Sequence, residues 1–188
     1  MPIEISFSLS DEDLKRFQAI IDKTRSSARD ESTAGEIEAA ARALISQAEQ
    51  SDLPEFVASR MRKLGILIEM INDEEWQLPE QDRRRILRAL AYLCKADDLI
   101  PDYIPGLGFL DDAIYAEIVI RELHDDLDTY LEFCAYRDRE EQRRLARGED
   151  VKVGREEWLA KKRTALHSEL KKRRMSRRAD GQWRLRLF

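Results

Sequence analysis

Four aspartates near the middle of the chain could together bind a divalent cation: Asp98, Asp102, Asp111 and Asp112. Carboxylate oxygens are the ligands that Mg²⁺ and Ca²⁺ prefer in proteins. A tight hairpin of two helices would bring the four side chains to one end of the hairpin. The sequence therefore raises the hypothesis of a magnesium- or calcium-dependent enzyme or sensor that uses these aspartates.

The same residues also have an explanation that needs no ligand. Asp111 and Asp112 stand where a helix is expected to begin, so their carboxylates can cap free N–H groups and complement the helix dipole. Asp98 and Asp102 flank Pro101, and aspartates in turns commonly bind nearby backbone N–H groups. The spacing matches neither an EF-hand loop nor a phosphate-binding P-loop. We favour this explanation and expect no cofactor, with Mg²⁺ or Ca²⁺ as the alternative.

Other reactive side chains give little support for catalysis. The pair His124-Asp125 occurs in metal phosphohydrolases, but these enzymes need several histidines and the chain has only one more, His167. Cys94 and Cys134 lie beside or on apolar stripes, which is typical of buried, reduced thiols. The sequence contains no serine-centred elbow, glycine-rich phosphate loop or C-x-x-C pair. We therefore predict no catalytic residues.

The segment that holds the aspartates, residues 92–112, is at once apolar and acidic. Loops that face solvent are usually polar, so we expect this one to pack against the protein. Pro101 and Pro105 would stiffen its turns, and Gly106 and Gly108 would supply positive φ angles. The predicted interaction loop consists of these four residues together with Asp98, Leu99, Ile100, Asp102, Ile104, Phe109, Asp111 and Asp112.

Three consecutive motifs in this loop carry a family resemblance. They read Asp98-Leu99-Ile100-Pro101-Asp102, Ile104-Pro105-Gly106-Leu107-Gly108 and Phe109-Leu110-Asp111-Asp112. Over about residues 85–122 the chain resembles the YkvA-like family, small bacterial helical proteins of unknown function. The resemblance implies two helices joined by this loop, and it implies no settled activity. The chain departs from the family just upstream, where Lys95, Ala96 and Asp97 replace the usual Ser-Pro and an aliphatic residue.

Charge is distributed unevenly along the chain. Residues 151–188 carry 13 Lys and Arg against 4 Asp and Glu, whereas the first 150 residues have a net charge of −14. The basic tail, residues 171–188, contains a dense run of Lys171, Lys172, Arg173, Arg174, Arg177 and Arg178. Such a run can bind the phosphates of non-specific nucleic acid or an anionic membrane surface. The alternative, which we favour, is that it lies along the acidic part of the same chain or stays hydrated on a helix.

Helical periodicity covers most of the chain, with apolar residues at three- and four-residue spacing. The predicted helices cover about residues 11–27, 34–50, 51–72, 79–96, 111–134 and 154–178. The charged stretch 137–147 either extends the fifth helix into solvent or forms a connector, and Gly148 closes it. We therefore predict a mainly all-α protein, a single helical bundle of about six helices that forms one domain, residues 1–188.

The two ends of the chain have the period of a strand instead. Residues 3–9 and residues 183–187 alternate apolar and polar side chains. One strand cannot satisfy its own backbone groups. The ends are therefore predicted to pair in a small sheet, either within one chain or across a homodimer.

Composition limits the classes of protein that remain. Charged residues make up 38% of the chain, and no stretch approaches the roughly 20 apolar residues that span a bilayer. The start lacks the basic and apolar regions of a signal peptide. We expect a cytoplasmic protein, peripheral to a membrane if its basic tail binds lipid. The leading hypothesis is a non-catalytic helical scaffold or interaction protein that contacts an unknown protein partner through the interaction loop and the basic tail.

Overall fold

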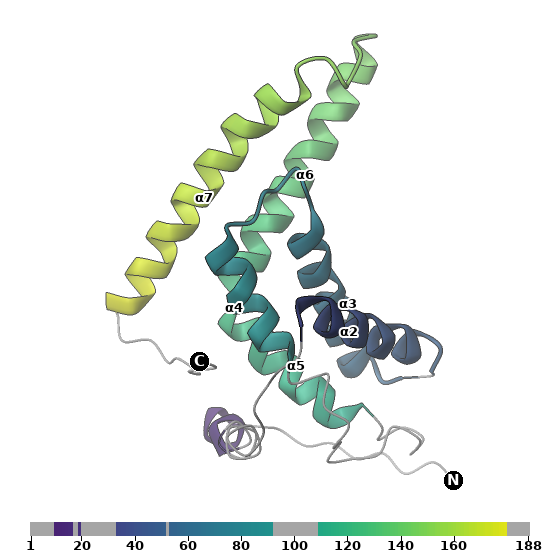
Figure 1. Ribbon diagram of the computed structural model, residues 1–188, viewed down its shortest axis with the longest axis vertical. Helices are drawn as coiled ribbons and strands as arrows, with labels where there is room; N and C mark the ends of the chain where they lie inside the picture. Colours follow the sequence, from purple (N-terminus) through teal and green to yellow (C-terminus); the bar gives the residue numbers. More distant parts are fainter. Residues whose placement is uncertain (1–9, 17–18, 20–32, 52, 92–108, 180–188) are drawn as a thin grey trace.

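The computed structural model describes residues 10–16, 19, 33–51, 53–91 and 109–179 of the chain. Its helices are α2 (Ala34–Glu49), α3 (Glu55–Asn72), α4 (Glu80–Leu90), α5 (Leu110–Glu122), α6 (His124–Ala146) and α7 (Arg155–Ala179). Residues 11–16 are helical as well. These described residues form helices and turns and contain no strand, which confirms the mainly all-α class (Figure 1).

The helix starts follow local sequence signals. The N–H group of Glu36 donates to Thr33 Oγ1 at 3.3 Å, and the N–H group of Thr33 donates to Glu36 Oε2 at 2.7 Å. This reciprocal capping box begins α2. Pro54 and Pro79 directly precede α3 and α4, where a fixed φ angle and a missing N–H group cost little. The predicted start at residue 34 is therefore confirmed.

The fifth predicted helix is divided into α5 and α6 at Leu123. This residue has φ −99° and ψ 15°, yet the backbone hydrogen bonds continue on both sides of it. Its N–H group donates to the Val119 carbonyl at 2.9 Å, and Leu127 N–H donates to the Leu123 carbonyl at 2.9 Å. Asp125 and Asp126 lie in the first turn of α6, where they complement the dipole of the new helix. The apolar stripe continues across this break, so the period of the stripe did not predict the break.

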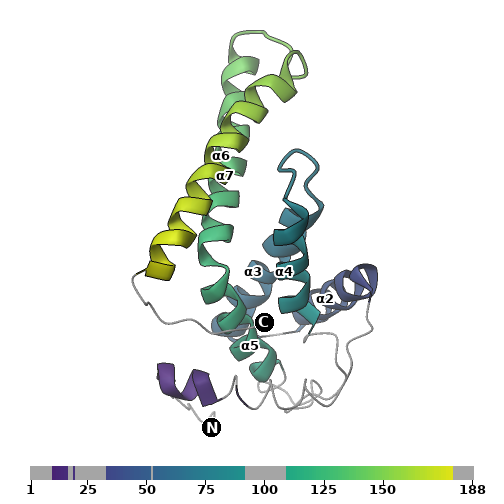
Figure 2. The same cartoon turned by 60° about the vertical axis from the view of Figure 1, so that its left-hand side comes forward.

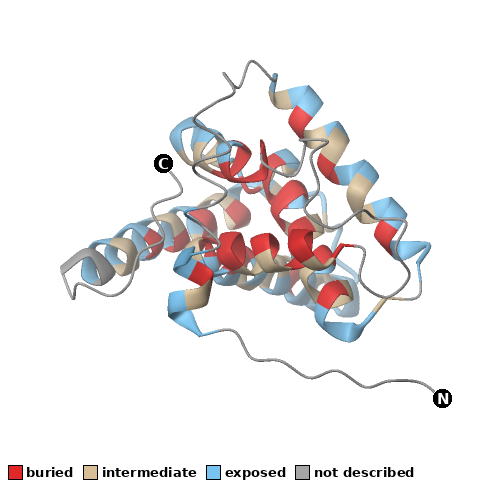
Figure 3. Cartoon of the chain, turned by 90° about the horizontal axis from the view of Figure 1, so that it is seen from below, coloured by how far each residue is buried: buried red, intermediate tan, exposed pale blue. Residues whose placement is uncertain are grey.

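Helix α5 lies at the centre of the core. It packs against α3, and α3 also packs against α2. Most of its residues are buried, and Figure 3 shows that the buried residues gather where the helices meet. A single hydrophobic cluster extends from Leu14 to Leu166 and includes the fully buried Trp76 in the turn between α3 and α4. This core fixes the two helices on either side of the predicted interaction loop.

Helices α6 and α7 form a long antiparallel hairpin that extends away from the other helices (Figure 2). The charged stretch 137–147 extends α6 and is not a separate connector. Gly148 ends the helix with φ +70°. Its N–H group donates to the Leu145 carbonyl, and Glu149 N–H donates to the Arg144 carbonyl, both at 3.0 Å. These two bonds form a Schellman motif, which needs a left-handed residue and favours glycine.

Some predictions fall on residues that the structure does not describe. The terminal segments 3–9 and 183–187, predicted to pair as strands, lie outside the described residues, as do residues 92–108 of the interaction loop. Among the helices that are described, none is both long and apolar enough to cross a bilayer.

Candidate functional site

The two helices that flank the interaction loop are tied together at its base. The Tyr115 hydroxyl of α5 donates to the Ala89 carbonyl of α4 at 2.9 Å. Both residues are fully buried. Ala89 lies in the last turn of α4, where helix carbonyls need partners from outside the helix. The tyrosine therefore closes the end of α4 and fixes it against α5.

Removal of this hydroxyl is expected to destabilise the fold. The substitution Tyr115→Phe leaves the Ala89 carbonyl buried without its tyrosine donor, so the free energy of unfolding should fall by about 1–3 kcal/mol. Urea denaturation measures this loss. The matched control is Tyr136→Phe, because Tyr136 is partly exposed on α6. Equal losses in the two variants would contradict a special role for the hydroxyl of Tyr115.

The last residue before α5, Phe109, has a strained backbone. Its φ is +64° and its ψ is 7°, in the left-handed region that bulky residues rarely adopt. Its side chain is 3% exposed and belongs to the core. Its carbonyl accepts the first hydrogen bond of α5, from Ala113 N–H at 2.9 Å. Strain of this kind costs about 1–3 kcal/mol and clusters at active sites, ligand clamps and switch regions.

Two of the four aspartates lie at the start of α5, as the sequence predicted. Asp111 and Asp112 occupy its first turn, and both are buried. The residue at the N-cap, Phe109, has no capping side-chain hydrogen bond, so the two carboxylates supply the negative charge that a helix start favours. Asp98 and Asp102 lie outside the described residues. Within the described part of the chain, no three His, Cys, Asp or Glu side chains gather as a metal site.

Comparison with protein families places a known signature on this same region. Residues 83–116, from α4 to the first half of α5, match the family described as "Protein of unknown function (DUF1232)". The segment is thus similar to the DUF1232 family. The match confirms the resemblance to the YkvA-like family, which is part of DUF1232, over a segment of the chain. No curated protein and no solved structure matches the chain. The buried Tyr115–Ala89 contact therefore lies within the matched segment.

In the described part of the basic tail, some side chains form ion pairs and others are exposed. Arg174 forms ion pairs with Asp126 and, at 2.7 Å, with Asp82. Arg173 pairs with Glu169 on its own helix. Burial disfavours the charge on Arg174, but the carboxylates of Asp126 and Asp82 raise its pKa above the ordinary value.

The other basic side chains of the run differ from Arg174. Lys171 and Lys172 are exposed on α7. The side chains of Arg177 and Arg178 lie outside the described residues. Arg174 is thus a structural residue of the hairpin, as expected if the tail lies along the acidic part of the chain.

A second charged cluster holds the turn 73–79 against the α6–α7 hairpin. Asp73 accepts hydrogen bonds from the Tyr130 hydroxyl at 3.0 Å and from Arg137 at 2.9 Å. Glu75 pairs with Arg137 at 3.0 Å and with Arg155. Burial would raise the pKa of Asp73, but the bonds from Arg137 and Tyr130 hold it below its usual value. The hydrogen bond from Arg155 lowers the pKa of Glu75. Both groups are therefore anchors that stay ionised at neutral pH.

Among the described residues, the nucleophile and base candidates lack an activated arrangement. Cys134 is half-buried, and burial raises the pKa of its thiol, which disfavours the reactive thiolate. His124 is exposed on α6 and lies 3.3 Å from Asp128. His167 packs on the Trp76 ring, with the ring centroids 4.3 Å apart. Cys94 lies outside the described residues.

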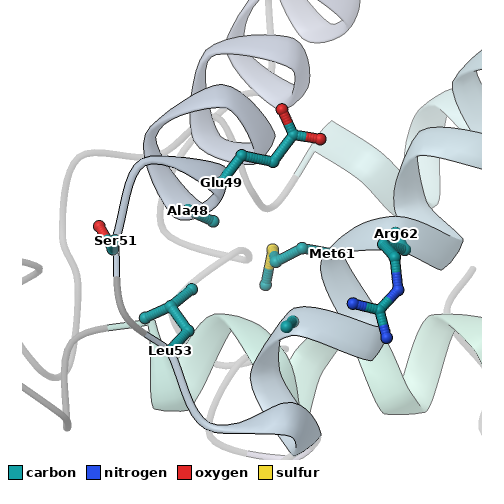
Figure 4. A pocket seen from close by; sticks show the side chains of 7 residues that line it. Ala48, Glu49, Ser51, Leu53, Met61 and Arg62 are labelled. Carbon is teal, nitrogen blue, oxygen red and sulfur yellow. The ribbon is translucent and has the colours of Figure 1, made fainter.

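A cavity that the sequence did not predict lies between the end of α2 and the start of α3. Its volume is about 320 Å³, which is within the range of small ligand pockets. Ala48, Leu53 and Met61 form an apolar lining, and Glu49 of α2 and Arg62 of α3 lie at its edge (Figure 4). The lining comes from two helices and the segment that joins them, so no single motif marks it.

Proposed function

We propose that this chain is a non-catalytic, cytoplasmic interaction protein that contacts a protein partner through the interaction loop, with its basic tail as a second contact. The observation that carries the proposal is Phe109. A buried aromatic side chain in the left-handed region costs stability, and such strain clusters at active sites, ligand clamps and switch regions, which supports a functional role for the adjoining loop.

The geometry at the base of the loop supports this proposal. The hydrogen bond from Tyr115 to Ala89 fixes the end of α4, and the buried carboxylates of Asp111 and Asp112 lie at the start of α5. The segment that joins these two points is rich in apolar residues. A rigid base reduces the entropy that binding would otherwise cost.

Two alternatives are open. The exposed Lys171 and Lys172 support peripheral binding of an anionic membrane or of nucleic acid, which would weaken steeply with salt. The engagement of Arg174 with two carboxylates reduces the charge that is available for it. A metal-dependent enzyme or sensor would need the loop aspartates Asp98 and Asp102 beside Asp111 and Asp112.

The test is affinity capture of partner proteins after chemical cross-linking. The full wild-type chain and the variants Leu99→Ser and Ile104→Ser serve as bait. The matched control is Leu131→Ser, which changes an exposed leucine of α6. Phe109 is left unchanged because its side chain belongs to the core. We expect a defined partner to be recovered with the wild type and the control, and at least tenfold less with the loop variants, at unchanged melting temperatures.

Two results would contradict this proposal. A large fall in the melting temperature of both loop variants would show that the loop is part of the core. Recovery of the same proteins by all four chains would exclude the loop as the contact. A rise in melting temperature with Mg²⁺ or Ca²⁺ that Asp112→Asn abolishes would favour the metal hypothesis instead.

A further inference from the structure

Helix α7 docks on the turn 73–79 through a face that carries a histidine. Arg163 Nη1 donates to the Glu75 carbonyl at 2.7 Å. One turn further along α7, the His167 ring packs against Trp76, with the ring centroids 4.3 Å apart and the ring planes at 83°. Trp76 is fully buried, so this ring contact joins α7 directly to the core of the fold.

One nitrogen of the His167 ring is enclosed by this contact region. Nε2 is inaccessible to solvent and has no hydrogen-bond partner among the described residues. A neutral imidazole has one nitrogen without a proton, and Nε2 can be that nitrogen, whereas a charged imidazole carries a proton on both. Protonation therefore places an N–H group at Nε2 with no acceptor among the described residues. A buried donor without a partner is costly, above all when it is charged.

The charges around His167 also oppose a further positive charge. Burial is the main cause that lowers the pKa of His167. Positive charges of α7 lower this pKa further, and they belong to Arg163, Lys171 and Arg174. The carboxylate of Asp82 in α4 acts against them, but it already pairs with Arg174 at 2.7 Å. The surroundings of the ring therefore favour its neutral form.

The other ionisable side chains beside this contact are engaged or exposed. Those of the turn, of α4 and of α6 that bind one another or arginines of α7 are Asp73, Glu75, Arg85, Asp126, Tyr130 and Arg137. Glu74 of the turn and Glu80 of α4 are exposed. Carboxylates, tyrosines and arginines titrate far from neutral pH. His167 is therefore the group of this interface whose charge can change in mild acid.

We propose that His167 is a pH-sensitive latch: its neutral ring holds α7 on Trp76, and its protonation in mild acid loosens the helix from the turn 73–79. The pKa of His167 lies below its ordinary value of 6.5 in the folded protein, so the unfolded chain binds the proton more readily. The stability that the neutral ring contributes is present above about pH 6.5 and is lost as the pH falls toward the pKa of the folded state.

The first test is urea denaturation of the wild type, His167→Gln and His124→Gln at pH 7.5 and pH 5.5. The unfolding equilibrium constant of the wild type should rise several-fold at the lower pH, up to the limit of about tenfold that one proton allows. His167→Gln should lack most of this rise because glutamine does not titrate. His124→Gln should keep it, since His124 is exposed on α6. The same rise in all three proteins, or no rise in the wild type, would overturn the proposal.

A charge reversal at an exposed residue tests the same latch and leaves the His167 ring in place. Lys171 is exposed and stands at the i+4 position from His167, so the two side chains are neighbours on the helix. Lys171→Glu should raise the pKa of the imidazole, measured by NMR titration, and reduce the rise in the unfolding constant. Lys172→Glu is the matched control, because Lys172 is also exposed but stands at i+5. Equal shifts in the two variants, or an ordinary pKa of His167 in the wild type, would contradict the latch.

Hydrogen exchange shows whether the effect belongs to α7. After correction for the intrinsic pH dependence of exchange, protection of the α7 amides should fall at pH 5.5 in the wild type and not in His167→Gln. Protection in α3 and α5 should fall less. An equal fall in all three helices would show that acid acts on the whole fold, and the latch would be wrong. If His167→Gln does not fold, the NMR titration of the wild type and of Lys171→Glu decides the question.

Discussion

Replacement of Asp126 with alanine is expected to lower the free energy of unfolding by about 3–5 kcal/mol. The Asp126 side chain is 2% exposed and forms ion pairs with Arg85 of α4 and Arg174 of α7. Its removal would leave two partly buried guanidinium groups without their shared carboxylate. Asp82 would remain as a partner, 2.7 Å from Arg174 and 4.0 Å from Arg85. Two partly buried arginines that share this one carboxylate should still cost more than the loss of an exposed ion pair. The loss should therefore be among the largest of any single substitution at a charged residue.

Urea denaturation with two further variants identifies the cause of this loss. Asp126→Asn should lose less than Asp126→Ala, because the amide oxygen still accepts a hydrogen bond from an arginine. Asp128→Ala is the matched control, since Asp128 lies on the same helix, is half-exposed and pairs with His124. Its loss should stay below about 1 kcal/mol. Similar losses for Asp126→Ala and Asp128→Ala would show that burial of the cluster adds nothing to the free energy of unfolding.

This cluster also shows why the sequence could not assign the basic tail. Lys171, Lys172, Arg173 and Arg174 form a uniform run of positive charge in the sequence. In the fold, one of them is held by two carboxylates from α4 and α6, and two others are exposed. Which residue of a run faces the protein depends on partners tens of residues away. A charge count contains no information about those partners.

The features that the sequence predicted well are the local ones. The capping box of Thr33 and Glu36 and the prolines before α3 and α4 act within a few residues, and the predicted starts at 34 and 79 lie within one residue of the observed ones. The predicted start at 51 was wrong, since α3 begins at Glu55, directly after Pro54. The kink at Leu123 could not be predicted, because the apolar stripe continues through it and the backbone hydrogen bonds persist. Only the packing of α5 and α6 against different neighbours distinguishes the two helices.

The features of the candidate site likewise fall into those that the sequence predicted and those that it did not. Asp111 and Asp112 were placed at a helix start by the motif alone, and the structure places them in the first turn of α5. Positive φ was expected at Gly106 and Gly108, which lie outside the described residues, and not at Phe109, which adopts it. The residue type gives no warning of this. The hydrogen bond from Tyr115 to Ala89 spans 26 residues and depends on how α4 and α5 pack. Local motifs therefore indicated where the site lies, and long-range contacts decide its shape.

Replacement of Trp76 with alanine should cost a further large amount, about 3–5 kcal/mol of the free energy of unfolding. Trp76 is fully buried in the turn between α3 and α4. Its ring contacts Tyr130 and Phe133 of α6 and His167 of α7, with centroid distances of 5.8, 5.0 and 4.3 Å. Its removal would open a cavity under the hairpin, and rigid neighbours fill such cavities only in part.

Hydrogen exchange measured with urea denaturation locates this loss within the fold. If Trp76 is the residue that holds the hairpin on the core, Trp76→Ala should reduce amide protection in α7 more than in α3 or α5. Trp158→Ala is the matched control, because Trp158 is partly exposed and packs beside Tyr136 at 6.0 Å within the hairpin itself. It should cost much less. An equal loss of α7 protection in both variants would mean that contacts within the hairpin, and not its contact with Trp76, keep α7 in place.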